Sequence, residues 1–416
     1  MAGVDQLQKH LRALNDGDDA AQRAAIHAFR ALEVEEWGAA PQSLVNPLVV
    51  SLQRFLRGGS RPPVVYKEVG GILVNLGPRA KGAVGPLIEL LEDGIPDSVR
   101  ESAARALGSL GRDAKDAVDS LVALCTNQST LALNAVRALG EIGCADQRVR
   151  NALVKVWLGW VHTRDDLLQV AHALCRLRIE MNGMIGFLTN HLMKSQAEAL
   201  RKSAAEALAW CKKTDTDVVP ALLTAALSDK NEDVRQTAQA ALDHLGLTQA
   251  KAILLCAKQL STSVYAEAAL RKSGQPAIAA LIEALGCDDS VTRIKAAQIL
   301  GSFGELAIDA VPVLTSALRD RNPEIRLATA KGLWSVTKNP DVAVPVLAQL
   351  LQDEPATGPD DDETRRKFLQ TVIEALWRIG PPASAALPAI IRKTKDKNRL
   401  VSQSAHNALK KIAPLG

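Results

Sequence analysis

The sequence predicts an all-α protein, built as a solenoid of about twelve stacked helical hairpins. Three observations lead to this fold class: a segment that recurs along the chain, a nearly constant period, and apolar residues at helical spacing. The composition agrees with it. Of the 416 residues, 47% are hydrophobic but only 3% are aromatic, which suits closely packed helices filled by Ala, Leu, Val and Ile.

The recurring segment is clearest from Ala83, where it reads AVGPLIELLEDGIPDSVRESAARALGSLG, and related segments start at Val218, Ala277 and Ala310. A leucine near the end of each second helix marks the register, and most successive anchors are 32 to 35 residues apart. These anchor leucines are Leu73, Leu107, Leu139, Leu174, Leu208, Leu242, Leu270, Leu300, Leu333, Leu376 and Leu409.

The repeats cover residues 83–413, and weaker hairpins over residues 4–77 precede them. One step between anchors is 43 residues long, because the acidic segment 353–363 is inserted there. This segment contains Pro and Gly and has little apolar surface to bury, so we expect a mobile loop. The chain is therefore expected to form one solenoid over residues 1–416.

Each repeat reads as helix, turn, helix. In the unit from Ala83, apolar residues recur up to Leu91, the segment 93–96 breaks the pattern, and the pattern resumes at Val99. Glycine follows the second helix in many repeats, where a C-cap with positive φ costs a glycine least. These glycines are Gly111, Gly143, Gly246, Gly274, Gly304 and Gly380.

The best-preserved unit carries Pro86-Leu87-Ile88, Asp93, Val99-Arg100, Ala103-Ala104 and Ala106-Leu107-Gly108. It resembles the short HEAT-like repeat that is named after phycobilisome lyases, and the resemblance covers most of the chain. The landmarks of tetratricopeptide and ankyrin repeats are missing. The resemblance implies a right-handed superhelix of HEAT-like or armadillo type.

The resemblance also implies a ladder, in which an acid in the turn of one repeat meets an arginine at the start of a second helix, in its own or the next repeat. A bidentate guanidinium would hold the turn and set the rotation between repeats. We interpret these residues as architectural because they recur with the hairpin. The ladder residues are Asp93, Arg100, Arg201, Asp229, Arg235, Asp288, Arg293, Asp320 and Arg326.

The solvent side of the second helices is the surface to examine for function, because it usually lines the concave face of such superhelices. The positions two residues before and after each anchor leucine hold seven cations against Glu141, Glu206 and Glu374. This basic bias is mild, like the net charge of +4. The candidate partner-binding residues are Arg105, Arg137, His172, Arg176, Trp210, Lys272, Lys331 and Arg378.

Two other regions have a structural and a functional interpretation. Trp157 and Trp160 could share a helix face, and either pack on the adjacent hairpin or anchor a partner. The basic stretch from Arg392 to Arg399 is either a solvated turn or a contact for an acidic partner, a membrane surface or nucleic acid.

Motifs for catalysis are missing from the sequence. There is no Gly-x-Ser-x-Gly elbow, Gly-x-Gly-x-x-Gly turn or Walker-type loop. No His is followed by Glu, although the HEAT-like di-iron hydroxylases use His-Glu pairs as metal ligands. The acidic runs around Asp18 and Asp361 lack the Gly and Glu of a calcium loop. We expect neither enzyme activity, nor a metal site, nor a cofactor.

We expect a cytoplasmic protein with no transmembrane segment. The N-terminal residues do not resemble a signal peptide, and the uncharged stretch of residues 38–53 is shorter than a bilayer span. No Cys-x-x-Cys pair occurs, and we expect reduced thiols in small sites between helices. The cysteines are Cys125, Cys144, Cys175, Cys211, Cys256 and Cys287.

The leading functional hypothesis is a non-catalytic scaffold that holds one or more protein partners along an extended surface. The alternative is nucleic-acid binding, with the basic residues of the second helices on phosphates, as in the helical-repeat DNA glycosylases, whose catalytic residues have no match here. A chromophore-lyase activity is suggested by the name of the repeat alone, since no site residues support it.

Overall fold

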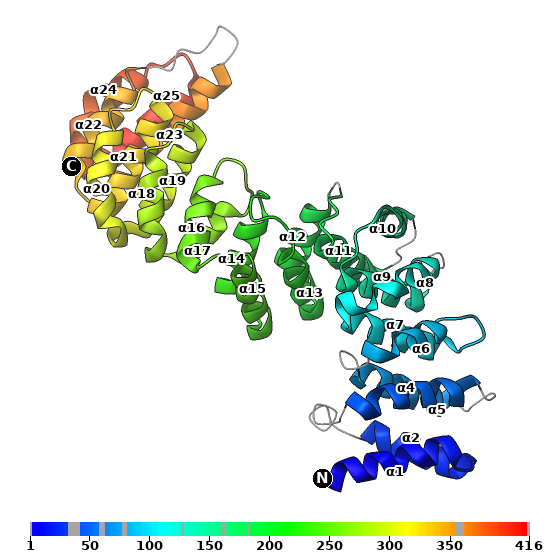
Figure 1. The fold of residues 1–416 in the computed structure, drawn as a ribbon. Coiled ribbons are helices and arrows are strands. Elements are labelled where there is room, and N and C mark those ends of the chain that lie inside the picture. Colours follow the sequence, from blue (N-terminus) through cyan, green and yellow to red (C-terminus); the bar gives the residue numbers. More distant parts are fainter. Residues whose placement is uncertain are drawn as a thin grey trace. The chain divides into compact units, whose positions relative to one another are not determined.

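The computed structural model describes residues 2–31, 42–57, 63–76, 81–125, 129–159, 163–181, 183–353 and 362–413. These residues form α-helices and short 3-10 helices, with no strand among them, so the predicted all-α class is confirmed. The expected mobile loop falls mainly on residues 354–361, which lie outside the described residues. The chain forms two compact units, Met1–Cys211 and Lys212–Gly416 (Figure 1).

The first unit consists of six helical hairpins, counted over its described residues. In chain order their helices are α1 (Ala2–Asp16) and α2 (Asp19–Ala31), α4 (Gln42–Arg57) and α5 (Pro63–Leu76), α6 (Val84–Glu89) and α7 (Asp97–Ser109), α8 (Val118–Leu124) and α9 (Thr130–Ile142), α10 (Gln147–Gly159) and α11 (Arg164–Arg176), and α12 (Met184–Lys194) and α13 (Glu198–Leu208).

The second unit also contains six hairpins in its described part. They are α14 (Val218–Ser228) and α15 (Glu232–His244), α16 (Gln249–Lys258) and α17 (Ala266–Ser273), α18 (Ile278–Leu285) and α19 (Ser290–Phe303), α20 (Val311–Ala317) and α21 (Pro323–Thr337), α22 (Pro340–Leu350) and α23 (Asp362–Ile379), and α24 (Leu387–Lys393) and α25 (Arg399–Ile412).

Short 3-10 helices lead into five of the first helices. They are η2 (Lys81–Ala83), η3 (Gly111–Ala117), η4 (Gln275–Ala277), η5 (Gly304–Ala310) and η6 (Pro381–Ala386). Together with the hairpins listed above, they account for the dozen repeats that the sequence predicts. Continuity of the stack from one unit into the other stays a prediction.

The helices of each unit form two layers. The second helices pack on one another in the order α5, α7, α9, α11 and α13, and likewise α19 on α21 and α23 on α25. First helices also pack on first helices, as α4 does on α6 and α18 does on α20. This arrangement buries the apolar faces that one hairpin alone would expose.

The anchor leucines lie at the centre of the core. Ten of the eleven, from Leu73 to Leu376, are at most 2% exposed. Each contributes about 2 kcal/mol of burial free energy, a value typical of a leucine side chain. Leu409 is only partly buried.

The glycines that follow the second helices adopt backbone conformations with positive φ. Gly143 has φ 77° and ψ 22°, and its N–H donates to the carbonyl of Leu139, as in a left-handed cap. Gly304 and Gly380 have φ 58° and 75° with ψ near −140°, a region that is essentially restricted to glycine. All six expected glycines have positive φ.

Other glycines let adjacent second helices approach closely. A Cβ atom on Gly140 of α9 would lie 2.9 Å from the Cα of Ala173 in α11. A Cβ atom on Gly301 of α19 would lie 2.7 Å from the Cα of Gly332 in α21. These distances are too short for any other residue, so glycine sets the spacing of these helix pairs.

One described stretch, Ser290–Ala317, is apolar and long enough to cross a membrane by length and composition alone. It contains α19, η5 and α20, and so the second helix of one repeat and the first helix of the next. The chain turns at Gly304 between them, and α19 packs on α21 while α20 packs on α18. We therefore interpret this stretch as two packed helices of the solenoid.

Candidate functional site

Four of the five ladder arginines bind the turn of their own repeat from the start of a second helix. Arg100 donates to the carbonyl of Leu91 and forms ion pairs with Asp93 and Asp97, at 3.0 and 3.2 Å. Its side chain is 14% exposed. In this repeat the guanidinium therefore joins the end of the first helix to the start of the second.

Three other ladder arginines bind backbone carbonyls of the turn. Arg201 donates to Ser195 and Gln196, both at 3.1 Å. Arg235 donates to the carbonyl of Asp229 at 2.8 Å, and Arg326 to that of Asp320 at 2.9 Å. The acids at these positions shape the turn as well, since the side chains of Asp229 and Asp320 accept backbone N–H groups within it. These contacts satisfy carbonyls that the helix end leaves open.

Two arginines bind the turn of the following repeat. Arg293 of α19 donates to the carboxylate of Asp320 at 2.5 Å, while Asp288 of its own turn is exposed and Asp289 caps the helix instead. Arg365 of α23 binds both carboxylate oxygens of Asp396, at 3.2 and 2.8 Å. Arg365 and Asp396 were not among the predicted ladder residues.

The second-helix face, meaning the exposed side chains of the second helices, contains the candidate partner-binding residues. In the first unit Arg105 of α7 and Arg137 of α9 are exposed, and His172 and Arg176 of α11 are partly buried. Trp210 follows α13 and is 36% exposed. In the second unit the exposed candidates are Lys272 of α17, Lys331 of α21 and Arg378 of α23.

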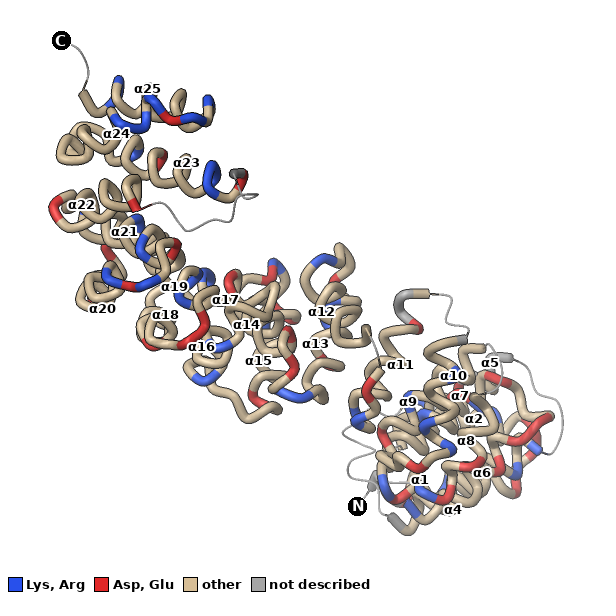
Figure 2. Tube along the Cα trace, turned by 90° about the horizontal axis from the view of Figure 1, so that it is seen from above, with Lys and Arg blue, Asp and Glu red and all other residues tan. Residues whose placement is uncertain are grey.

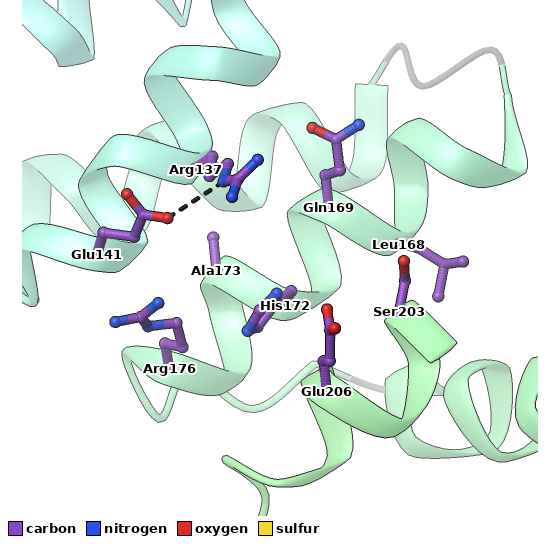
Figure 3. A pocket seen from close by; sticks show the side chains of 9 residues that line it. All are labelled: Arg137, Glu141, Leu168, Gln169, His172, Ala173, Arg176, Ser203 and Glu206. Carbon is purple, nitrogen blue, oxygen red and sulfur yellow. Dashed lines mark hydrogen bonds and ion pairs between the residues drawn. The ribbon is translucent and has the colours of Figure 1, made fainter. Parts of the chain in front are cut away.

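A pocket of about 230 Å³ opens on this face between α9, α11 and α13 (Figure 3). Helix α9 contributes Arg137 and Glu141, and α13 contributes Ser203 and Glu206. Helix α11 lies in the middle and forms the rest of the wall with Leu168, Gln169, His172, Ala173 and Arg176. The structure thus brings three of the candidate residues, Arg137, His172 and Arg176, to one pocket, with side chains from three consecutive repeats.

The two arginines of the pocket are held differently. Arg137 donates its Nε–H to Glu141 Oε1 at 3.1 Å, one turn along the same helix. The guanidinium carbon of Arg176 lies 4.7 Å from the ring centroid of Trp210, in a cation–π contact. No ion pair joins Arg176 or Glu206 to another residue that the structure describes.

His172 lies at the centre of the pocket between these charges (Figure 3). Its Nε2 atom is buried and has no hydrogen-bond partner among the described residues. Burial, together with the positive charges of Arg176 and Arg137, lowers the pKa of His172 to about 4. The imidazole is therefore neutral at pH 7.

Gln169 and Ser203 were not among the sequence candidates. Each lies five residues before an anchor leucine, and therefore three residues before a position that was considered. Residues three apart share a face of an α-helix, so this spacing is the signal that would have found them.

A second pocket, of about 300 Å³, lies between α19, α21 and α23 of the second unit. The candidate Lys331 lines it together with Gln298, Lys367 and the apolar residues Leu327 and Phe368. Lys272 and Arg378 do not line either of these pockets. Arg378 instead pairs with Glu374 at 2.7 Å on the surface of α23.

The remaining unusual residues have local partners. Trp157 is partly buried and packs edge-on against Phe187 of α12, with 5.8 Å between ring centroids, while Trp160 lies outside the described residues. Figure 2 shows basic and acidic segments interspersed along the chain, with basic residues gathered between α24 and α25. There Lys393 approaches Asp396 at 3.7 Å.

Within the described residues, no group of three or more His, Cys, Asp and Glu side chains is arranged to hold a metal ion. The Sγ atoms of Cys175 and Cys211, which belong to neighbouring repeats, lie 3.3 Å apart.

Stacked hairpins with a polar second-helix face define the chain as an α-helical repeat protein. The chain contains HEAT-like repeats: HEAT repeats match residues 185–271 and 278–358, and the PBS lyase HEAT-like repeat matches residues 99–127. The resemblance found in the sequence is therefore confirmed.

Three known proteins are similar to parts or all of the chain. The uncharacterized protein SkfG of Bacillus subtilis (strain 168) is 40% identical over 77 residues, which are 18% of this chain and 44% of SkfG. The karyopherin Kap121p, bound to the extreme C-terminus of the protein phosphatase Cdc14p, gives a TM-score of 0.39 at 15% identity, over 99% of this chain and 50% of its own. Human deoxyhypusine hydroxylase gives a TM-score of 0.28 at 21% identity, over 89% of this chain and 97% of the hydroxylase chain. The matched regions thus span 50% of the length of Kap121p and 44% of the length of SkfG.

Proposed function

We propose that this protein is a non-catalytic scaffold that binds one or more protein partners along its second-helix face. One observation carries the proposal: side chains from three consecutive repeats converge on the pocket between α9, α11 and α13. Three ladder arginines, by contrast, donate their N–H groups to carbonyls of the adjacent turn: Arg201, Arg235 and Arg326.

The composition of this face suits a protein partner. Arg and Trp are enriched among the residues that dominate protein–protein binding energy, and Arg176 and Trp210 stand together at the edge of the pocket. Because the second helices repeat along each unit, a partner can make modest contacts with several of them at once.

The charges of the pocket oppose nucleic-acid binding. A groove that follows phosphates needs many cations and few anions. Here Glu141 and Glu206 lie in the same pocket as the two arginines. A protein surface with both signs of charge matches this pattern better than a phosphate backbone does.

The test is an affinity pull-down from native extract at physiological salt, with and without nuclease, using three forms of the intact protein. These are the wild type, Arg137→Glu on the second-helix face, and Lys155→Glu on the first helix α10. Both variants change the same charge at an exposed position. We expect stoichiometric, nuclease-resistant protein partners that Arg137→Glu loses and Lys155→Glu retains.

The proposal fails if no protein partner is recovered, or if both variants retain it equally. Recovery that disappears with nuclease would instead establish nucleic-acid binding.

A further inference from the structure

We propose that the pocket between α9, α11 and α13 receives one acidic side chain, a glutamate or aspartate, from an extended segment of the protein partner. This inference rests on the proposed function and adds the chemistry of the contact. The cavity of about 230 Å³ has room for a single side chain, and donors from α9 and α11 surround it.

Arg176 is the best-prepared donor of the pocket. Trp210 covers one face of its guanidinium at 4.7 Å, so the group is held while the N–H groups at its edge stay available. A planar guanidinium that is fixed by stacking matches the two oxygens of a carboxylate. Arg137 donates only its Nε–H to Glu141, so its terminal nitrogens can donate to the same carboxylate ligand.

His172 supplies a third polar group between the two arginines. Its Nε2 atom is buried without a hydrogen-bond partner among the described residues, and a buried polar atom of this kind costs about 1–3 kcal/mol. A carboxylate oxygen in the pocket would accept a hydrogen bond from this nitrogen when it carries a proton. Ligand binding would thereby satisfy an atom that the fold leaves open.

The acidic residues of the pocket favour a single negative charge. Glu141 is already paired with Arg137, and Glu206 reaches the pocket from α13. A phosphate dianion would be repelled by both carboxylates more strongly than a carboxylate would. Glu206 also favours a partner in which a lysine lies next to the acidic residue, because this lysine could pair with the carboxylate of Glu206.

Binding of an acid would change the titration of His172. In the free protein the imidazole is buried and faces Arg137 and Glu141 from α9, Arg176 from its own helix, and Glu206 from α13. A bound carboxylate offsets the two guanidinium charges, so it raises the pKa of His172 from about 4. The affinity should accordingly rise as the pH falls from about 7 to about 5, above the usual pKa of the glutamate ligand.

The experiment follows the histidine ring signals of the intact protein by NMR during pH titrations, with His172→Gln to assign the signal. The probe is the acetylated and amidated peptide Gly-Glu-Lys-Gly at millimolar concentration, and the matched peptide Gly-Gln-Lys-Gly is the control. We expect the glutamate peptide alone to raise the midpoint of His172 by about one pH unit or more. Arg176→Ala should abolish this shift, whereas Arg105→Ala, which removes an exposed arginine outside the pocket, should keep it.

Equal shifts with both peptides, or none with either, would overturn the proposal. A larger shift with a phosphoserine peptide of the same length would overturn the assignment to carboxylates. The scaffold function is judged separately, by the pull-down. If a recovered partner binds Arg176→Ala as tightly as the wild type, the scaffold stands and the pocket assignment fails.

Discussion

Arginines serve two roles in this chain, and their position relative to the anchor leucine separates them. Arg100, Arg235 and Arg326 each lie seven residues before an anchor leucine, and each donates to its own turn. Arg105 and Arg137 lie two residues before an anchor and point to the second-helix face. The first position is at the start of the helix beside the turn, whereas the second lies more than one helical turn further along.

The Arg365–Asp396 pair should be the ion pair that matters most for stability. Both side chains are less than 10% exposed, and the pair is bidentate. Removing one partner leaves the other charge buried, so Arg365→Ala should lower the free energy of unfolding by about 3 kcal/mol. Arg378→Ala is the matched control on the same helix, because its pair with Glu374 is exposed and contributes about 0.5 kcal/mol or less. Urea unfolding of both variants tests this, and equal losses would contradict it.

The same pair predicts a dependence of stability on pH. Burial raises the pKa of Asp396, but hydrogen bonds from Arg365 and Asn398 outweigh burial, and the net pKa is lowered. The folded protein therefore holds this carboxylate charged more readily than the unfolded chain does. Its contribution is present above about pH 4 and is lost as the pH falls through the folded pKa. Asp396→Asn should be less stable than the wild type at neutral pH and approach it in acid.

Cys175 and Cys211 should form a disulfide under mild oxidation. Their Sγ atoms are 3.3 Å apart, against about 2.05 Å in a disulfide bond, so a small movement suffices. With hydrogen peroxide the two thiols lose two protons and two electrons, and the peroxide is reduced to two waters. Peptide mapping of the non-reduced protein should find this pair linked. Cross-links spread equally over other cysteines would refute the prediction.

Between elements, glycine sets how close the second helices approach. Gly301→Ala places a methyl group 2.7 Å from the Cα atom of Gly332 in α21. A backbone atom cannot move aside as the end of a flexible side chain can. We expect a loss of about 1–3 kcal/mol in the free energy of unfolding, although alanine is the better helix former. Gly186→Ala in α12 is the control, because a methyl group there meets nothing within 4 Å. It should stabilise the protein by up to about 1 kcal/mol, and thermal unfolding of both variants measures the difference.

At the level of the whole molecule, the chain divides into two compact units. The unit Lys212–Gly416 has its own two layers of helices, and we expect this fragment to fold alone with a cooperative thermal transition. A fragment that starts at Glu232 lacks α14, whose residues from Val218 to Ala225 are buried. Circular dichroism should show that this shorter fragment loses helix at lower temperature. A Lys212–Gly416 fragment that is unfolded by itself would show that the two units depend on each other.

The periodicity of the sequence determined the fold class, the helix pairs and the buried anchor leucines, because each hairpin must bury the same apolar stripe against a similar neighbour. It also determined which rows of side chains face solvent, since residues at a constant offset from the anchor share a helix face.

Only the tertiary structure decided which residues of these rows meet. The pocket depends on how closely α9, α11 and α13 approach one another. The contact of Gly140 with Ala173 sets the distance between α9 and α11, and the pattern of a single repeat does not contain this distance. The Arg365–Asp396 pair was hidden because Arg365 lies eleven residues before its anchor leucine and not seven, directly after the inserted segment. Residues that meet between neighbouring repeats are about thirty residues apart in the chain. Sequence spacing predicts such contacts only where the repeat is regular.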